Sequence, residues 1–115
     1  MQLELLVDQS IGSGRFFVTS NSREDILMGT VFTFLFTHAM KLVDGNFEEA
    51  GISRVTEVRL KIVEIEFWRK PHPCVPYGHH AGVRFEGNGL QSLEEQLNDC
   101  SKLSNVIVVT KMRDA

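Results

Sequence analysis

The stretch of residues 55–85, VTEVRLKIVEIEFWRKPHPCVPYGHHAGVRF, decides the fold. Its first half alternates apolar and charged side chains, which is typical of a strand with one buried face. The apolar positions run first in one phase and then in the other: Val58, Leu60 and Ile62, followed by Val63, Ile65 and Phe67. One extra residue at Ile62–Val63 is what a β-bulge inserts, and bulges bend long strands so that a sheet can coil into a barrel.

Shorter runs of strand-forming residues lie on both sides of this stretch. They are bounded by glycine and polar turn residues and span residues 2–8, 15–19, 30–37, 81–87 and 106–109. Gly12, Ser13 and Gly14 predict a hairpin turn between the first two. Six or so short strands predict a mostly β, single domain over residues 1–115: a small closed or partly open antiparallel β-barrel with one C-terminal helix.

That helix is predicted over residues 91–100. Ser92 and Glu95 have the spacing of a capping box, and Leu93 and Leu97 recur at i, i+4. Residues 38–52, HAMKLVDGNFEEAGI, break the strand rhythm, and two alternatives stay open for them: one helical turn around residues 46–50, or an irregular excursion.

The strand predicted over residues 30–37 is apolar on both faces. Phe32, Phe34 and Phe36 alternate with Val31, Thr33 and Leu35. One face is expected to line the core, and the other to be covered by the following segment or by a partner. A bare face would predict a homodimer.

Composition narrows the class of protein. Hydrophobic residues make up 43% and charged residues 23%, as in ordinary globular proteins, and no apolar run approaches the ~20 residues of a membrane span. The first residues, MQLELLVDQ, predict no signal peptide. Cys74 and Cys100 are expected to be free thiols, which predicts a cytoplasmic protein. The net charge of −3 disfavours general nucleic-acid binding.

Three segments together resemble a known family. Residues 5–19 (LLVDQSIGSGRFFVT) are similar to a strand, a glycine turn and a second strand. Residues 63–70 (VEIEFWRK) and 81–87 (AGVRFEG) follow in the same order. This pattern resembles the second, β-barrel domain of translational GTPases such as elongation factor Tu, over about half of the chain.

The chain also departs from that family. Ser20 stands where the family has a glycine, and residues 38–52 and the Pro/His loop at residues 71–80 have no counterpart. No G-x-x-x-x-G-K-[ST] loop exists in the sequence. The resemblance therefore implies a fold and a binding role rather than nucleotide hydrolysis.

The Pro/His loop, PHPCVPYGHH, holds side chains that can ligate zinc or act as nucleophiles. His72, Cys74, His79 and His80 are competent ligands, but their spacing matches no structural zinc pattern, so no metal site and no cofactor is predicted. Cys74 beside histidines lacks the other parts of a nucleophilic site. The simpler interpretation is a stiff, exposed loop.

Aromatic and basic residues gather at the end of the bulged strand. The group consists of Trp68, Arg69, Lys70, His72, Tyr77, His79 and His80. Aromatic residues beside arginine are typical of interface hot spots, and they also stack on bases in single-stranded nucleic-acid binders. The alternative is that Trp68 packs under the proline loop and closes the barrel end.

These patterns favour a non-catalytic protein-binding domain. The leading hypothesis is an inhibitor or immunity-type protein that neutralises a basic partner such as a toxin nuclease. The alternative is a translation-associated module that contacts RNA or the ribosome, and a third is a thiol-dependent enzyme that uses Cys74. An inhibitor should gather its acidic residues on one exposed face: Asp44, Glu48, Glu49, Glu94, Glu95 and Asp99.

Overall fold

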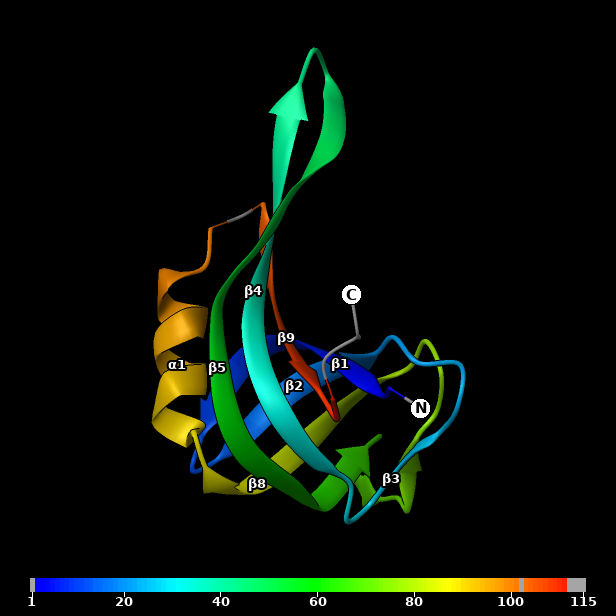
Figure 1. The fold of residues 1–115 in the computed structure, drawn as a ribbon. Coiled ribbons are helices and arrows are strands. Elements are labelled where there is room, and N and C mark those ends of the chain that lie inside the picture. The colour runs from blue at the N-terminus through cyan, green and yellow to red at the C-terminus, as the bar shows by residue number, and fades with distance from the viewer. Residues whose placement is uncertain (1, 102, 112–115) are drawn as a thin grey trace.

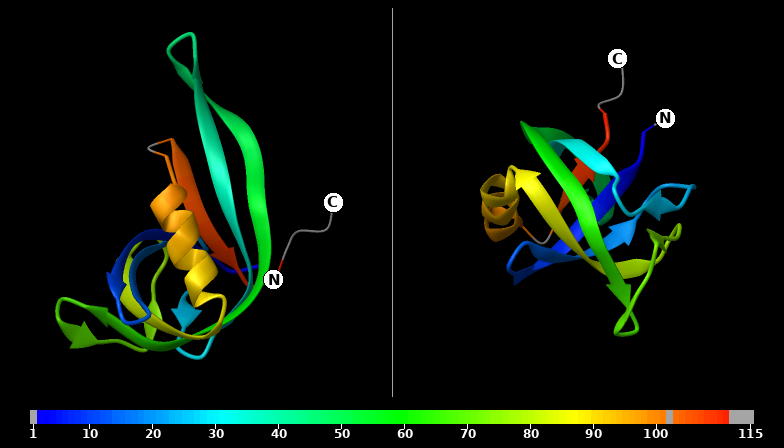
Figure 2. Two further views of the ribbon diagram at one scale, coloured as in Figure 1. Left: turned by 90° about the vertical axis from the view of Figure 1, so that its left-hand side faces the viewer. Right: turned by 90° about the horizontal axis from the view of Figure 1, so that it is seen from below.

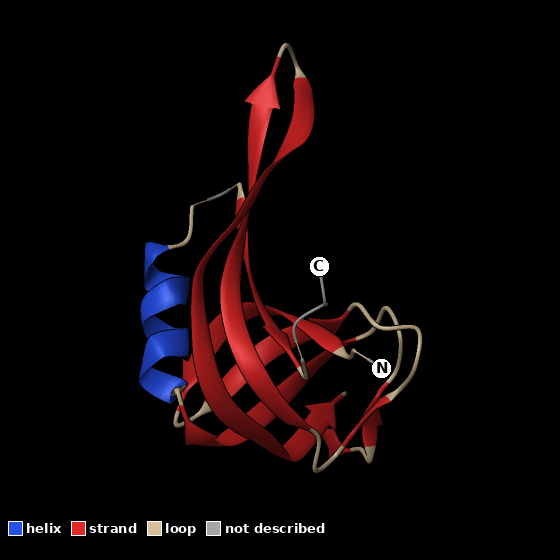
Figure 3. Ribbon diagram, viewed as in Figure 1, coloured by secondary structure: helices blue, strands red, loops and turns tan. Residues whose placement is uncertain are grey.

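The computed structural model describes residues 2–101 and 103–111. Within them, six antiparallel strands form a ring in the order β4, β9, β1, β2, β8, β5, and β5 pairs back to β4 (Figure 1). Their bounds are β1 Glu4–Gly12, β2 Arg15–Ser20, β4 Val31–Val43, β5 Asn46–Phe67, β8 His80–Asn88 and β9 Ser104–Val109. The ring is not a regular barrel, but the predicted class, mostly β with one helix and a partly open barrel, is confirmed (Figure 3).

Three short strands lie at one end of the ring. β6 (Lys70–Pro71) folds back on the end of β5, and β3 (Ile26–Leu27) pairs with β7 (Cys74–Val75). The Pro/His loop is therefore held by its own pairings. The peptide N–H of His72 also donates to the carbonyl of Ile65 at 2.8 Å.

The predicted bulge in β5 is confirmed. The pairing of β5 with β8 shifts register between Ile62 and Glu64, and Ile62 and Ile65 are both buried. Three more register shifts interrupt the pairing of β5 with β4. Because each bulge bends the strand and increases its twist, one strand of 22 residues can pair with β8 on one edge and with β4 on the other. The bulges close the ring.

Residues 38–52 form neither a helical turn nor an irregular excursion. They complete a long β4–β5 hairpin whose end projects from the ring (Figures 1 and 2). Asp44 and Gly45 form its two-residue turn, with φ of 49° and 81°. Asp-Gly is a preferred pair for a type I′ hairpin turn, so the sequence did carry the signal. Residues 40–52 are called the arm below.

The main core fills the ring. Its largest fully buried side chains include Phe16, Phe32 and Phe85, and the rings of Phe32 and Phe85 meet edge to face with centroids 5.9 Å apart. The expected common face of Phe32, Phe34 and Phe36 is wrong. Phe32 and Leu35 enter the main core, whereas Phe36 joins Ile107 and Val109 in a second cluster, with Phe34 packed against it. The pairing of β4 with β5 shifts register between Phe32 and Phe34, which changes the strand's phase.

Helix α1 (Leu90–Asp99) lies against one side of the ring and inserts Leu93 into the main core (Figure 2). The predicted capping box is wrong: Gly89 is the N-cap and no side chain caps the helix. A Cβ at Gly89 would lie 2.4 Å from Val58 Cγ1, so the tight passage from β8 into α1 requires glycine.

The side chain of Gln96 joins α1 to the hairpin. Gln96 is 2% exposed. Its Oε1 accepts from the Thr37 hydroxyl at 2.8 Å, and its Nε2 donates to the Arg54 carbonyl at 2.8 Å. Arg54 also pairs with Asp99 at 2.8 Å. The helix is thus fixed to the base of the arm by buried and exposed polar contacts.

Among the described residues, no helix has the length and apolarity to cross a membrane.

Candidate protein-binding groove

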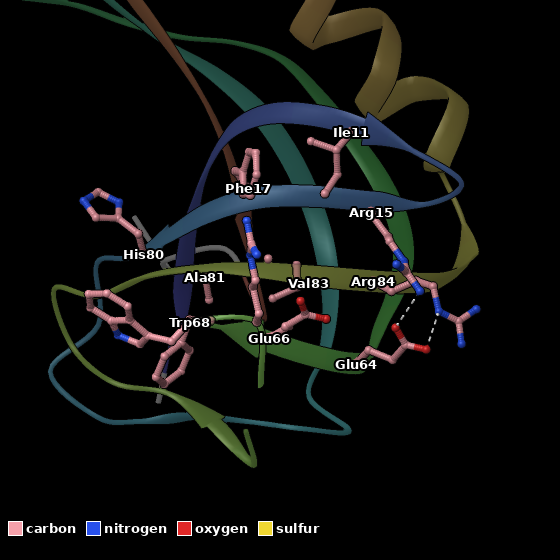
Figure 4. A pocket seen from close by; sticks show the side chains of 13 residues that line it. Ile11, Arg15, Phe17, Glu64, Glu66, Trp68, His80, Ala81, Val83 and Arg84 are labelled. Carbon is pink, nitrogen blue, oxygen red and sulfur yellow. Dashed lines mark hydrogen bonds and ion pairs between the residues drawn. The ribbon is translucent and has the colours of Figure 1, made fainter. Parts of the chain in front are cut away.

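A groove of about 430 Å³ lies on the outer surface of β2, β8 and the end of β5 (Figure 4). Outward-facing side chains of these three strands form its floor and sides, and the β5–β6 turn borders it. Its lining consists of Ile11, Arg15, Phe17, Glu64, Glu66, Phe67, Trp68, Arg69, His80, Ala81, Gly82, Val83 and Arg84.

Gly82 lies in the middle of the groove and leaves an open space above the strand. Phe17 on β2 and Glu66 on β5 are its cross-strand partners on either side. Because Gly82 has no side chain, nothing fills the space between them. A Cβ at Gly82 would meet only the Glu66 carbonyl at 3.6 Å and Phe17 Cε1 at 4.0 Å. Phe17 itself is 47% exposed, so an aromatic ring forms one wall of the groove.

The opposite wall comes from a strained turn. Trp68 and Arg69 are the two residues between Phe67 and Lys70, which pair with each other, and their φ angles are 55° and 60°. Positive φ at both positions defines a type I′ turn, which favours Asn-Gly or Asp-Gly. For residues with a side chain this conformation costs about 1–2 kcal/mol each. The turn pays that cost to hold Trp68, the chain's one tryptophan, 88% exposed.

Charged residues form one end of the groove. Glu64 lies between two arginines, with Oε2 3.1 Å from Arg15 Nη2 and Oε1 3.3 Å from Arg84 Nε (Figure 4). The second contact is an ion pair only, since the Arg84 Nε–H is not aligned for a hydrogen bond. Arg84 also pairs with Glu86 at 3.3 Å. This end is therefore electrostatically balanced by its own side chains.

His80 lies at the other end. Its Nδ1 is 2.7 Å from the hydroxyl of Thr19, which donates its own proton to Asp8 Oδ2 at 2.9 Å. Because the hydroxyl proton is already used, Nδ1 must carry the hydrogen in the contact with Thr19. In the tautomer with the proton on Nδ1, Nε2 is a hydrogen-bond acceptor. Among the described residues, neither Glu66 nor Arg69 has an ion-pair partner within the chain.

The structure brings together three of the seven residues predicted from the sequence: Trp68, Arg69 and His80. Trp68 faces solvent rather than packing under the proline loop. His72, a residue of the loop itself, stacks its ring on Phe67 with centroids 3.4 Å apart. Lys70, Tyr77 and His79 are exposed but do not line the groove.

The other ten residues that line the groove, above all Phe17 and Gly82, were not predicted from the sequence. A signal for Phe17 was present. Phe16 and Phe17 are adjacent in one strand and must point to opposite faces, so one of them had to lie outside the core. Nothing in the sequence placed Gly82 between Phe17 and Glu66, because that depends on the register of three strands.

The loop cysteine shows no sign of activation. Cys74 pairs with Leu27 on β3, and burial, followed by the charge of Asp25 and a hydrogen bond to it, raises the pKa of its thiol. A reactive cysteine needs a lowered pKa. Among the described residues, no group of three or more His, Cys, Asp or Glu side chains is arranged to hold a metal ion.

Comparison of the chain with family models, with curated proteins and with solved structures found no match. The resemblance to the second domain of translational GTPases stays a prediction.

Proposed function

We propose that this chain is a non-catalytic protein-binding domain that takes an extended segment of a partner protein into the groove between Trp68 and Phe17. The observation that carries the proposal is the Trp68–Arg69 turn. Two residues with large side chains occupy positions that favour Asn and Gly, and the result is a tryptophan that is 88% exposed beside an open groove. Strain of this kind gathers at functional sites.

The lining of the groove supports a peptide-like ligand. Two aromatic walls provide apolar contact area, and the edges offer Glu66, Arg69 and the Nε2 of His80 for polar contacts. Tryptophan and arginine are the residues most enriched in interface hot spots. The groove has the size of a small-ligand pocket, which suits one or two side chains of an extended segment.

Selection from a random peptide library displayed on phage tests this proposal. Peptides selected on the intact protein should lose binding to the Trp68→Ala variant by roughly thirty-fold, the effect of a hot-spot residue. Tyr77→Ala is the matched control, because Tyr77 is an exposed aromatic residue outside the groove. Failure to enrich any peptide, or equal loss in both variants, contradicts the proposal.

The charge pattern favours a protein partner over RNA. Arg59 and Lys61 face outward on β5, but Glu57 on one side and Glu64 and Glu66 on the other flank them along the strand. Arg54 is paired with Asp99. An RNA-binding surface needs an uninterrupted basic patch. The raised pKa of Cys74 argues against the thiol-dependent enzyme.

The inhibitor hypothesis expects its acidic residues on one exposed face, but they form two groups. Asp44, Glu48 and Glu49 lie on the arm, whereas Glu94, Glu95 and Asp99 lie on α1. All three of the helix group are engaged within the chain, Glu94 by Ser10, Glu95 by Gln91 and Asp99 by Arg54. The arm group is therefore the better candidate for a basic partner. Both cysteines are free thiols, which supports a cytoplasmic location for such a complex.

A further inference from the structure

The arm has one apolar face that the described part of the chain leaves exposed. Cross-strand partners share a face, so Leu42 lies beside Phe47 on it and His38 beside Ile52. Met40 and Glu49 lie between these two pairs on the same side, so the face is apolar apart from one carboxylate. Leu42 is 58% exposed, Phe47 64% and Ile52 49%. Isolated two-stranded hairpins are marginally stable in water. Contact of these apolar side chains with another surface therefore stabilises the arm.

The arm is also acidic. It carries Asp44, Glu48 and Glu49 against one basic residue, Lys41, which gives residues 40–52 a net charge of −2. His38 lies 3.7 Å from Glu49 at the base. Two-stranded ribbons of this shape fit the major groove of DNA, but three carboxylates would face the phosphates there. The charge therefore favours a positively charged protein surface over a nucleic acid.

A second copy of the chain fits poorly. The arm is about 20 Å long and about 10 Å wide by ordinary strand spacing, so one face offers on the order of 200 Å². A stable interface buries roughly 800 Å² from each partner. Pairing two arms would also bring six carboxylates together. A concave partner surface can contact both faces and both free edges of the arm, and it therefore buries more area than contact with one face does.

Polar contacts at the base of the arm fix its direction relative to the ring. Gln96 bonds to Thr37 and to the Arg54 carbonyl, and the Arg54 guanidinium pairs with Asp99 of α1. An element held this way loses little conformational freedom on docking.

We infer that the arm inserts into a basic, concave surface of a partner protein, with Phe47 buried as its apolar anchor. The arm projects from the ring, whereas the groove lies on β2, β8 and the end of β5 (Figures 1 and 4). The inference goes beyond the proposed groove function and does not require it.

Site-specific photocrosslinking tests this inference. The full chain carries p-benzoylphenylalanine in place of Phe47, or in place of Leu27 as the control, which is an exposed apolar residue on β3. Each protein is irradiated in an extract of the cells that make it, and the adducts are mapped by mass spectrometry. We expect an adduct from position 47 alone, at a lysine- and arginine-rich segment of one protein.

The partner identified in this way is then purified and titrated with variants. Phe47→Ala should weaken binding by roughly thirty-fold, and the Glu48→Lys, Glu49→Lys double variant by at least about tenfold, with the remaining binding less sensitive to salt. All three side chains are exposed, so circular dichroism should show an unchanged fold. Trp68→Ala should leave the adduct in place, which separates failure of the groove from failure of the arm.

Other outcomes overturn the inference. These are an adduct with a second copy of the chain, an adduct at an acidic or neutral segment, no adduct at all, or unchanged affinity after charge reversal. Labelled duplex DNA and single-stranded RNA are titrated in parallel, and binding of either through the arm also contradicts it.

Discussion

Phe17 and Gly82 are cross-strand partners on the outer surface of the ring, and the side chain that Gly82 lacks leaves the space of the groove. The distances at Gly82 permit a larger residue, since an added Cβ makes only ordinary contacts, at 3.6 Å with the Glu66 carbonyl and at 4.0 Å with Phe17. The groove can therefore be filled without disturbing the sheet beneath it.

The first prediction follows from this relationship. Gly82→Val should abolish binding of groove-selected peptides, because the β-branched side chain occupies their site. The melting temperature should stay the same or rise, since valine suits a strand better than glycine does. Isothermal titration and thermal unfolding measure the two effects, with Gly82→Ala as the smaller step. Retained binding in the valine variant would show that peptides bind elsewhere.

The second prediction concerns the strained turn. The double variant Trp68→Asn, Arg69→Gly should gain about 1–3 kcal/mol in free energy of unfolding, because Asn-Gly suits the type I′ turn. This corresponds to roughly 2–8 °C in melting temperature for each kcal/mol. The same variant should lose peptide binding. The turn of the arm is the control: Asp44→Asn keeps a favourable pair there and should change stability little. Unchanged stability of the double variant would mean that the turn stores no strain.

The third prediction concerns the buried amide that joins α1 to the hairpin. Gln96→Ala should lower the free energy of unfolding by about 1–3 kcal/mol, because the Thr37 hydroxyl and the Arg54 carbonyl lose their buried partner. Chemical denaturation measures the change. Gln91→Ala, an exposed position on the same helix that bonds only to Glu95 in the described structure, should cost much less. Equal effects of the two variants would contradict the assigned role.

The fourth prediction uses the raised pKa of Cys74. Burial and the charge of Asp25 both disfavour the thiolate, so Cys74 should react more slowly with a disulfide reagent at neutral pH than an unperturbed thiol, and its rate should climb as the pH rises above the ordinary cysteine range. Asp25→Asn removes the negative charge beside the thiol and should speed the reaction, while the rate at Cys100 stays unchanged. Fast reaction of Cys74 in the unmodified protein would support the hypothesis of a thiol-dependent enzyme.

The local signals in the sequence identified several elements correctly. The phase change at Ile62–Val63 located the bulge, because side chains alternate strictly along a strand and one extra residue must reverse that alternation. The glycine-flanked turn at Ser13 and the apolar run from Val106 to Val109 were also readable, and the final strand lies between β4 and β1. Three of the thirteen residues that line the groove, Trp68, Arg69 and His80, were predicted from the same stretch of sequence.

What the sequence by itself determined was the alternation of buried and exposed positions, the mostly β class and the unusual Trp-Arg pair. Tertiary structure decided what these residues meet. Gly82 faces Phe17 and Glu66 only because β2, β8 and β5 pair in one register, and Gly89 is required only because Val58 lies against it. Pairing between distant strands depends on the summed packing of the whole core, which no short stretch of sequence contains.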